Sequence, residues 1–341
     1  VDANRNVTRM TQAGGGIYEY SYDAVHRLTG VRTPLGYEQA YAYDDGDNLT
    51  AVSDNLDREE AYTYDLMHRM LTATDALGGV TAYTYDERGN QTSLTDALGY
   101  QSSYTYDLAD RLTAAIDPEG KATEYVYDQV GNIESITRPG GRTVSYAYDG
   151  VYNLTGLTDP MGYTYTYSYD GDSRLTGTLD PLGQTESYTY DAGSRLTDYT
   201  DKMGLTESYG YDNHGNVTKV TATDGKVTRY QYDLLDRLTQ VTSPNGSKTH
   251  YSYDSMGNLT QVTDAMQRTS HYTYDLEGNL LSLTDEAGRT ETMAYDIAGR
   301  LTSYTSGGGN TIRYDYDKLN NLVEKAFEDA QGEESAPGVL Y

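Results

Sequence analysis

The sequence contains no Cys, no Trp and a single Phe among its 341 residues. The absence of Cys excludes disulfide bonds, thiolate catalysis, and zinc or iron–sulfur sites with Cys ligands. Basic residues are also scarce, with 25 Lys and Arg against 52 Asp and Glu, for a formal net charge of -27. Phosphate backbones and anionic membranes would repel such a chain, so we expect no nucleic-acid partner. No stretch approaches the roughly 18 apolar residues that a membrane-spanning helix needs, so we expect no membrane insertion.

Tyr and Gly are in excess, with 38 and 35 residues. Only 37% of the residues are hydrophobic and the mean hydropathy is -0.72, which leaves little material for a thick globular core. Tyr and Thr favour strands, and disordered chains contain few aromatic residues, so disorder does not fit either. The chain starts at Val1-Asp2-Ala3 without an initiator Met, and we interpret it as a fragment of a longer parent protein.

A repeat of 21 residues is the dominant feature of the sequence. The pair Tyr-Asp recurs at this interval from Tyr22-Asp23 to Tyr316-Asp317, and Val1-Asp2 falls in the same register, which gives sixteen units. Five residues after the Tyr, every unit has Asn or Arg, usually followed by an apolar residue and Thr. The consensus is Y-D-x-x-G-[NR]-L-T-x-V-T-D-P-L-G-x-x-T-x-Y-x.

Each unit contains two turn signals and two strand signals. Asp180-Pro181-Leu182-Gly183 is typical of a type I turn, and the segment after each Tyr-Asp pair has the Asp, Gly and Asn residues of a second turn. Between the turns, Tyr-x-Tyr alternates with period two, and Leu-Thr-x-Val-Thr is rich in β-branched residues. The pattern predicts one β-hairpin per unit, and therefore an all-β, continuous antiparallel hairpin array of roughly 32 strands.

The period alone also permits a parallel β-helix or a leucine-rich repeat. The L-x-x-L-x-L pattern of leucine-rich repeats is missing, and a β-helix needs aliphatic ladders inside, whereas this unit offers Tyr, Thr and about two aliphatic residues. Tyr has an apolar ring and a polar tip, which suits a single-layer sheet with two wet faces.

The motif Y-x-Y-D-x-x-G-[NR]-L-T with a Gly-closed second turn resembles the YD or Rhs repeat family. The resemblance covers residues 1–322. The family includes bacterial Rhs and polymorphic toxin proteins, shell subunits of insecticidal toxin complexes, and teneurins. It implies hairpins wound into a curved or spiral hollow β-shell, which in the bacterial toxins encloses a C-terminal toxin. The D-P-x-G strings at Asp159–Gly162 and Asp180–Gly183 are internal repeat turns, so the toxin-release site of Rhs proteins cannot be assigned here.

From this resemblance we expect a non-catalytic structural module of a secreted or cell-surface bacterial protein. Its expected partners are further repeats or plug domains of the same parent chain, and an enclosed toxin domain. The alternative is a cell-surface adhesion module, or a fibre or stalk that presents ligand-binding regions. Sugar or choline binding by aromatic hairpins would need Trp-lined cages, and the sequence has no Trp.

We predict a single repeat array over residues 1–341, with sixteen units over 1–336. The last unit loses the Thr and Gly pattern between 327 and 338, and we interpret this segment as a turn lengthened by about six residues. The alternative is a short amphipathic helical cap that uses Val323, Ala326, Phe327 and Ala330.

Candidate sites are all repeat positions, so no unit has a unique constellation. We expect each Asp of the Tyr-Asp column to hold its own turn rather than a metal, and Asp44-Asp45-Gly46-Asp47-Asn48 lacks the closing Glu of a calcium loop. We expect the Arg column to pair with Asp and to pack over neighbouring Tyr rings, rather than to bind a ligand. This column comprises Arg27, Arg69, Arg111, Arg174, Arg195, Arg237 and Arg300.

The five His residues are His26, His68, His214, His250 and His271. His250 and His271 share a register and are expected one hairpin apart as exposed strand residues. No Ser/His/Asp set, phosphate loop or carboxylate pair stands out, so we predict no enzymatic activity, no catalytic, cofactor-binding or metal-binding residues and no cofactor.

Two expectations concern contacts between units. Tyr83, Tyr104, Tyr125 and Tyr146 share one register and should form a continuous row across neighbouring hairpins. Strands around Val7–Thr11 and Leu322–Ala326 should be unpaired edges, so we expect end-to-end self-association or fraying.

Overall fold

The computed structural model describes residues 1–332 and 334–340, the last seven as backbone only. Two compact units are present, unit 1 (Val1–Ala82 with Thr249–Tyr341) and unit 2 (Tyr83–Lys248). The described residues form strands and turns without any helix, so no helix that could cross a bilayer occurs among them.

The strands are short and regular, and most have five or six residues. Unit 1 contains β1 (Arg9–Thr11), β2 (Ile17–Tyr22), β3 (Leu28–Arg32), β4 (Glu38–Tyr43), β5 (Leu49–Asp54), β6 (Glu59–Tyr64), β7 (Met70–Thr74), β25 (Leu259–Thr263), β26 (Thr269–Tyr274), β27 (Leu280–Thr284), β28 (Thr290–Tyr295), β29 (Leu301–Thr305), β30 (Thr311–Tyr316), β31 (Leu322–Glu328) and β32 (Glu334–Leu340). Unit 2 contains β9 (Gln91–Thr95), β10 (Gln101–Tyr106), β11 (Leu112–Ile116), β12 (Ala122–Tyr127), β13 (Ile133–Arg138), β14 (Arg142–Tyr148), β15 (Leu154–Thr158), β16 (Thr164–Tyr169), β17 (Leu175–Leu179), β18 (Thr185–Tyr190), β19 (Leu196–Thr200), β20 (Thr206–Tyr211), β21 (Val217–Thr221), β22 (Val227–Tyr232) and β23 (Leu238–Thr242). The strands β8 (Val80–Tyr85) and β24 (Lys248–Tyr253) each contribute residues to both units.

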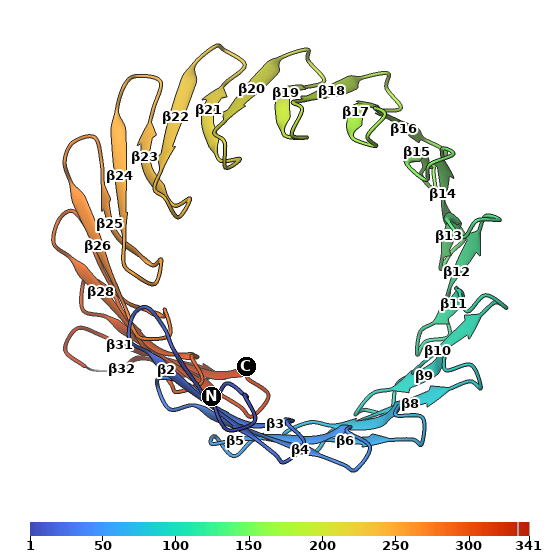
Figure 1. Cartoon of the computed structure of the whole chain (residues 1–341), viewed down its shortest axis with the longest axis horizontal. Coiled ribbons are helices and arrows are strands. Elements are labelled where there is room, and N and C mark those ends of the chain that lie inside the picture. Colours follow the sequence, from blue (N-terminus) through green and yellow to red (C-terminus); the bar gives the residue numbers. More distant parts are fainter. Residues whose placement is uncertain (333, 341) are drawn as a thin grey trace. The chain divides into compact units, whose positions relative to one another are not determined.

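Within each unit, strands that follow one another in the chain pair antiparallel, as β10 pairs with β11 and β11 with β12. Figure 1 shows the strands of unit 2, from β9 to β23, following one another along a curve. The predicted all-β array of antiparallel hairpins is therefore confirmed.

Two turns alternate along the chain, and both have the same backbone design. We call the turn that opens with the Asp of each Tyr-Asp pair the YD turn, and the second one the return turn. In the return turn at Asp180–Gln184, the Gly183 amide donates to the Asp180 carbonyl at 2.9 Å, and Gly183 has φ of 80°. This is a type I turn followed by a left-handed residue, as the sequence predicts.

A β-bulge precedes every YD turn whose pairing is described. On β10 and β11, Thr105 pairs with Ala114 and Tyr106 with Leu112, so Thr113 is the extra residue. The same shift recurs along the chain, for example before Tyr127, Tyr148 and Tyr169. The hydroxyls of Thr105 and Thr113 lie 3.0 Å apart, which explains why Thr suits the bulge position. A bulge increases the local strand twist, so its repetition contributes a regular curvature to the sheet.

Among the described residues no apolar side chain is fully buried, and Ser93 and Gln240 are the buried polar ones. Strand β18 shows the reason, because Tyr188 and Tyr190 are half-buried while Thr189 between them is exposed. The sheet is a single layer, so the Tyr rings cover one face of it without a second layer above them. Stability must therefore come from contacts between adjacent strands and turns.

The predicted continuous row of Tyr side chains is wrong in one respect. Tyr104 on β10 and Tyr125 on β12 share a register, but the intervening strand β11 lies between them, and Tyr104 faces Ala115. Tyr125 likewise faces Ile136, and Tyr146 faces Leu157. Hairpin geometry alternates the Tyr strands with the Leu-Thr-x-Val-Thr strands, so each Tyr packs mainly against the residue at the Val position of the consensus.

The C-terminal unit also differs from both expectations. Residues Leu322–Glu328 form the seven-residue strand β31, followed by a tight turn in which the Gly332 amide donates to the Asp329 carbonyl at 2.9 Å. The extra residues thus lengthen the strands rather than the turn, and no helical cap forms. Because β31 pairs with both β30 and β32, Leu322–Ala326 is not a free edge. The first Tyr of a next unit was expected at Tyr341, which lies outside the described residues.

Candidate functional site

The Asp of each YD turn is the centre of a local hydrogen-bond network. In the turn at Asp191–Arg195, Asp191 Oδ1 accepts the backbone amides of Gly193 at 2.8 Å and Arg195 at 3.0 Å. Its Oδ2 accepts Arg195 Nε at 2.7 Å. The Asp column therefore holds the turns, as the sequence analysis expects.

We call the position five residues after the Tyr of each Tyr-Asp pair the Asn/Arg column. The residue at this position donates to the second carboxylate oxygen of the turn Asp. Where the column has Asn, its side-chain amide takes the place of the guanidinium, as Asn48 Nδ2 donates to Asp44 Oδ2 at 2.9 Å. Where it has Arg, Nε donates, as in Arg27 to Asp23 at 2.6 Å. Both residue types place one N–H donor at the same point, which is why the position accepts only these two.

The Arg residues of this column also reach the next repeat. Arg195 Nη1 donates to the Asp212 carbonyl, 17 residues ahead, at 2.7 Å, and its guanidinium lies 4.9 Å from the centre of the Tyr211 ring. The same double contact occurs for Arg27, Arg111, Arg174 and Arg300. The expected Arg–Asp pairing and packing over neighbouring Tyr rings is confirmed for these residues.

In several repeats a further link joins the column residue to the side chain at the fourth position of the next YD turn, which has a positive φ. Asn90 Nδ2 donates to Asp110 Oδ1 at 2.9 Å, and Asn216 Nδ2 to Asp236 Oδ1 at 2.7 Å. His26 Nδ1 and Asn6 Oδ1 lie 3.1 Å apart in the same arrangement. Non-glycine residues thus occupy a strained position and form bonds between repeats there.

The Tyr of the Tyr-Asp pair has a role that the sequence analysis missed. Tyr211 OH donates to the Leu196 carbonyl, 15 residues earlier, at 2.7 Å, and thereby connects two consecutive repeats. The same bond is made by Tyr22, Tyr43, Tyr64, Tyr106, Tyr127, Tyr148, Tyr169, Tyr190, Tyr232, Tyr295 and Tyr316. The constant spacing of Tyr was visible in the sequence, but a bond to a backbone carbonyl has no sequence signal of its own.

These networks shift the pKa values of many groups. Hydrogen bonds from the side chain and backbone of Asn48 hold the pKa of Asp44 below its ordinary value of 3.8, and Arg111 does the same to the pKa of Asp107. Tyr62 OH donates a hydrogen bond to the Glu60 carboxylate, which raises the pKa of Tyr62 to about 12. Glu186 raises the pKa of Tyr199 to about 12 in the same way. The charged Asp and the neutral Tyr are thus the forms that the fold stabilises.

In the segment Asp44–Asn48, which superficially resembles a calcium loop, Asp44 accepts a hydrogen bond from Asn48 and Asp47 accepts one from Arg27. Their carboxylates therefore stabilise turns and contacts between repeats. His250 on β24 and His271 on β26 are exposed and separated by β25. No group of three or more His, Asp or Glu is arranged to hold a metal within the part of the chain that the structure describes.

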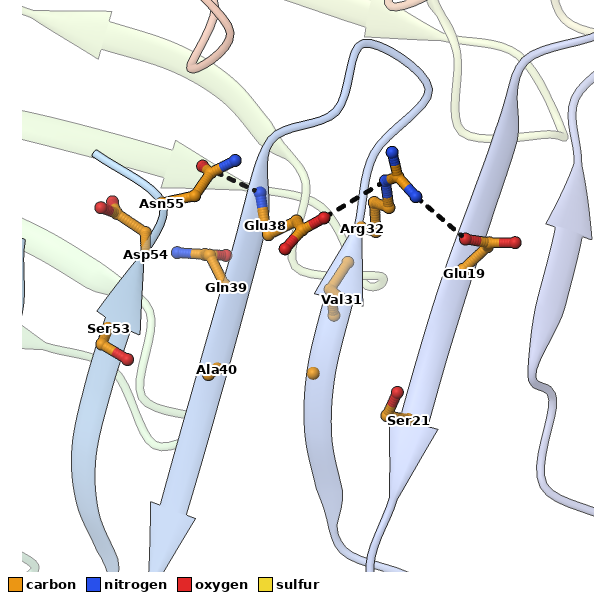
Figure 2. Close-up of a pocket in the computed structure, with 11 residues that line it drawn as sticks. Glu19, Ser21, Val31, Arg32, Glu38, Gln39, Ala40, Ser53, Asp54 and Asn55 are labelled. Atoms are coloured by element: carbon orange, nitrogen blue, oxygen red, sulfur yellow. Dashed lines mark hydrogen bonds and ion pairs between the residues drawn. The ribbon is translucent and has the colours of Figure 1, made fainter. Parts of the chain in front are cut away.

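A shallow polar groove of about 500 Å³ lies over β2, β3, β4 and β5 of unit 1. Figure 2 shows Arg32 between Glu19 and Glu38, with closest ion-pair distances of 3.9 and 3.3 Å. Ser21, Ala40 and Ser53 line its floor. The three charged side chains are more than half exposed, and no nucleophile with an adjacent base is present in the groove, so its geometry does not indicate a catalytic centre.

The family model described as RHS Repeat matches the chain in thirteen segments between residues 2 and 330, which together leave only residues 39–42 and 123–126 uncovered in that range. The chain belongs to the RHS repeat family. A search of curated proteins gives no match. Family membership agrees with the hairpin lattice described above.

Among solved structures, the crystal structure of TcdB2-TccC3-Cdc42 superimposes with a TM-score of 0.76 at 15% identity, over 95% of this chain and 22% of that chain. TcdB2-TccC3 alone gives 0.74 at 15% identity, over 95% and 22% of the two chains. The Photorhabdus luminescens Tc holotoxin pore with the TccC3 mutation D651A gives 0.55 at 15% identity, over 96% and 22%. The chain spans about a fifth of the length of these structures, and the likeness establishes the fold.

Proposed function

We propose that this chain is a non-catalytic section of the wall of a hollow Rhs shell that encloses a C-terminal toxin. The observation that carries the proposal is the way side chains are used. In repeat after repeat, Asp, Asn or Arg, and Tyr are engaged in bonds within a turn or to the next repeat. A lattice of this kind is suited to forming a wall, because the bonds between its side chains tie each repeat to the next.

The similarity to Tc toxin structures supports the same proposal. Those proteins carry such repeats within much longer chains, so we infer that this array continues into further repeats or plug domains of a parent protein. We also propose a secreted or cell-surface location for that parent, which the likeness to Tc toxin structures supports. The acidic composition, at -27, is suited to a wall that repels nucleic acids and anionic membranes.

The test uses the full-length parent protein, by electron microscopy and limited proteolysis. Encapsulation predicts a closed hollow particle with density inside, and a C-terminal domain that resists protease until the array is unfolded. An extended fibre with a protease-accessible tip would overturn the proposal in favour of adhesion or a stalk. Purified 1–341 is expected to show no hydrolysis of peptides, glycans or esters, and turnover abolished by one point mutation would contradict the non-catalytic assignment.

A further inference from the structure

Unit 1 contains a lateral contact between turns that are distant in sequence. We number the repeats from repeat 1 at Val1 to repeat 16 at Tyr316. The backbone amide of Leu35, in the return turn of repeat 2, donates to Glu277 Oε1 in the YD turn of repeat 14, at 3.0 Å. Lys318 Nζ in repeat 16 donates to the Asp57 carbonyl in repeat 3 at 2.6 Å. Return turns of the first repeats thus lie on YD turns of the last repeats, in the region where the ribbons of both chain ends overlap in Figure 1.

The contact is close-packed. A Cβ atom on Gly14, in the return turn of repeat 1, would lie 2.7 Å from the Met256 Sδ atom in the YD turn of repeat 13. A side chain at this position would therefore force the flexible Met256 side chain to shift. Arg58 Nη1 also donates to Asn320 Oδ1 across the same contact.

The burial of the turn tips depends on this contact. In the return turns of unit 1 that are covered, Pro34, Leu35 and Leu56 are half-buried. The same third position in the return turns of unit 2 is exposed, at 81% for Leu98, 79% for Met161, 83% for Leu182 and 78% for Met203. We call these last four residues the return-turn row.

The YD turns show the matching difference. Met256 and Glu277, which are covered in unit 1, are half-buried. In unit 2 the tips of the YD turns are exposed, at 91% for Leu108, 66% for Val130 and 70% for Leu235. We call these three residues the YD-turn row. The turn tips that are in contact in unit 1 are therefore half-buried. The apolar tips of both rows in unit 2 have no such contact among the described residues.

Turns of one kind recur every 21 residues along the meander, so neighbouring tips are spaced by two strands, about 9.6 Å. In the return-turn row, Met161, Leu182 and Met203 stand in three consecutive turns. In the YD-turn row, Leu108 and Val130 stand at the second and third positions of consecutive turns, and Leu235 lies five turns further on. The contact in unit 1 has one polarity, with return turns lying on YD turns. Two copies that join a return-turn row to a YD-turn row would reproduce it as a heterologous contact.

We propose that the return-turn row of unit 2 is a docking edge for the YD-turn row of a second copy of this chain. The argument is continuity with the contact inside unit 1, which uses the same turn types, and the exposure of apolar tips where that contact is missing. Apolar contact between the exposed turn tips drives the association, while the net charge of -27 opposes it. The contact is lateral, through turns, and differs from end-to-end pairing of terminal strands.

Sedimentation of the 341-residue chain over a range of protein and salt concentrations tests the proposal. We expect self-association that strengthens with salt, because salt screens the repulsion between copies. The double variant Leu182→Asp/Met203→Asp should weaken it by about tenfold or more, since it places charges in the row. The matched control Val126→Asp/Leu179→Asp alters two exposed apolar residues on strand faces and should leave it unchanged.

A cysteine pair gives a second readout, because the chain has no Cys of its own. Leu182→Cys protein mixed with Leu235→Cys protein should form mixed disulfides faster than Leu182→Cys mixed with Val126→Cys. A chain that stays monomeric at all salt concentrations would overturn the proposal. Association that the Leu182/Met203 variant leaves intact would overturn it in favour of end-to-end strand pairing.

Discussion

Two return turns of unit 1 have the same internal bonds but different surroundings. In the turn at Asp54–Arg58, Asp54 accepts the amides of Leu56 and Arg58 and the Arg58 Nε atom. In the turn at Asp285–Arg289, Asp285 accepts the corresponding groups of Ala287 and Arg289. The side chains of Arg58 and Asp54 are 13% and 6% exposed, whereas those of Arg289 and Asp285 are 72% and 21% exposed.

The difference comes from neighbours outside the turn. Arg58 also donates to the Tyr37 hydroxyl at 2.8 Å and to Asn320, and Tyr37 donates to Asp54 Oδ2 at 2.9 Å. The turn motif thus determines the local conformation in both places, and the surrounding repeats determine how strongly its charges are coupled. Because no apolar side chain is fully buried among the described residues, such neighbours contribute to the stabilisation.

Acid should have the largest effect on stability and should remove the difference between the covered and the exposed turn, because it protonates the Asp of every turn. Hydrogen bonds lower the pKa of turn residues such as Asp44 and Asp107 below 3.8, so the unfolded chain binds more protons than the folded chain near that pH. Stability should therefore be fully present above pH 3.8 and fall as the pH drops through the folded pKa values. Circular dichroism during acid titration measures this, and a fold unchanged down to pH 2, a value near the low end for hydrogen-bonded carboxylates, would contradict it.

Alkali should act through the Tyr hydroxyls. Tyr62 and Tyr199 have pKa values raised to about 12, against an ordinary value of 10.0, so the folded chain holds these protons more tightly. Their contribution is complete below pH 10 and is lost as the pH rises toward 12. Tyrosinate absorbance and circular dichroism should change together, and full Tyr ionisation at pH 10–11 in a folded protein would be the opposing result.

The substitution Asp54→Ala should break the covered turn, at a cost of about 2–3 kcal/mol in the free energy of unfolding. It leaves the nearly buried Arg58 guanidinium without its carboxylate partner and removes the bond from Tyr37. Asp285→Ala is the matched control, and its loss should be clearly smaller because the Arg289 pair is exposed. Urea unfolding of the two variants gives the comparison, and equal losses would show that the surroundings do not matter.

Tyr125 and Tyr127 on β12 allow a similar comparison between a bonded and an unbonded side chain within unit 2. Tyr127 OH donates to the Leu112 carbonyl at 2.8 Å, whereas no hydrogen bond from the hydroxyl of Tyr125 is present among the described residues. Tyr127→Phe should cost about 1 kcal/mol, and Tyr125→Phe should cost little. Thermal unfolding of both proteins measures the difference, and a larger loss for Tyr125→Phe would contradict the assigned role.

The smallest effect is expected at the left-handed position of the YD turn. Tyr152 has φ of 70°, where Gly is favoured, so Tyr152→Gly should stabilise the chain by about 0.5–1 kcal/mol. Gly131→Ala, at φ of 101° in the preceding repeat, should destabilise by a similar amount. The two melting temperatures should move in opposite directions, and a loss of stability in Tyr152→Gly would show that the Tyr side chain contributes a contact of its own.

Much of this architecture can be predicted from the sequence because its signals are local. Asp180-Pro181 and the Gly that follows specify a return turn, and Tyr-x-Tyr with period two specifies a strand. The pairing of Arg195 with Asp191 follows from their separation of four residues in one turn. Repetition makes each local signal reliable, since the same answer recurs in sixteen units.

The features that could not be predicted depend on contacts between residues that are separated along the sequence. The bulge at Thr113 depends on strand pairing, and the bond from Tyr211 to the Leu196 carbonyl depends on how two hairpins align. The contact of Leu35 with Glu277 joins residues 242 positions apart, for which a 21-residue period gives no signal. The last unit was misjudged because its missing Thr and Gly pattern was interpreted as a loop, whereas Phe327 continues strand β31.

The central claim is that repeats are stabilised by bonds to their immediate neighbours, so damage should remain local. Asp191→Ala tests it most directly, because Asp191 accepts two backbone amides and anchors Arg195, which reaches Asp212 in the next repeat. Hydrogen exchange resolved along the chain should show faster exchange in β18, β19 and β20, and unchanged protection in β10 to β13. A uniform loss of protection throughout unit 2 would contradict the claim and would mean that the array unfolds as one cooperative body.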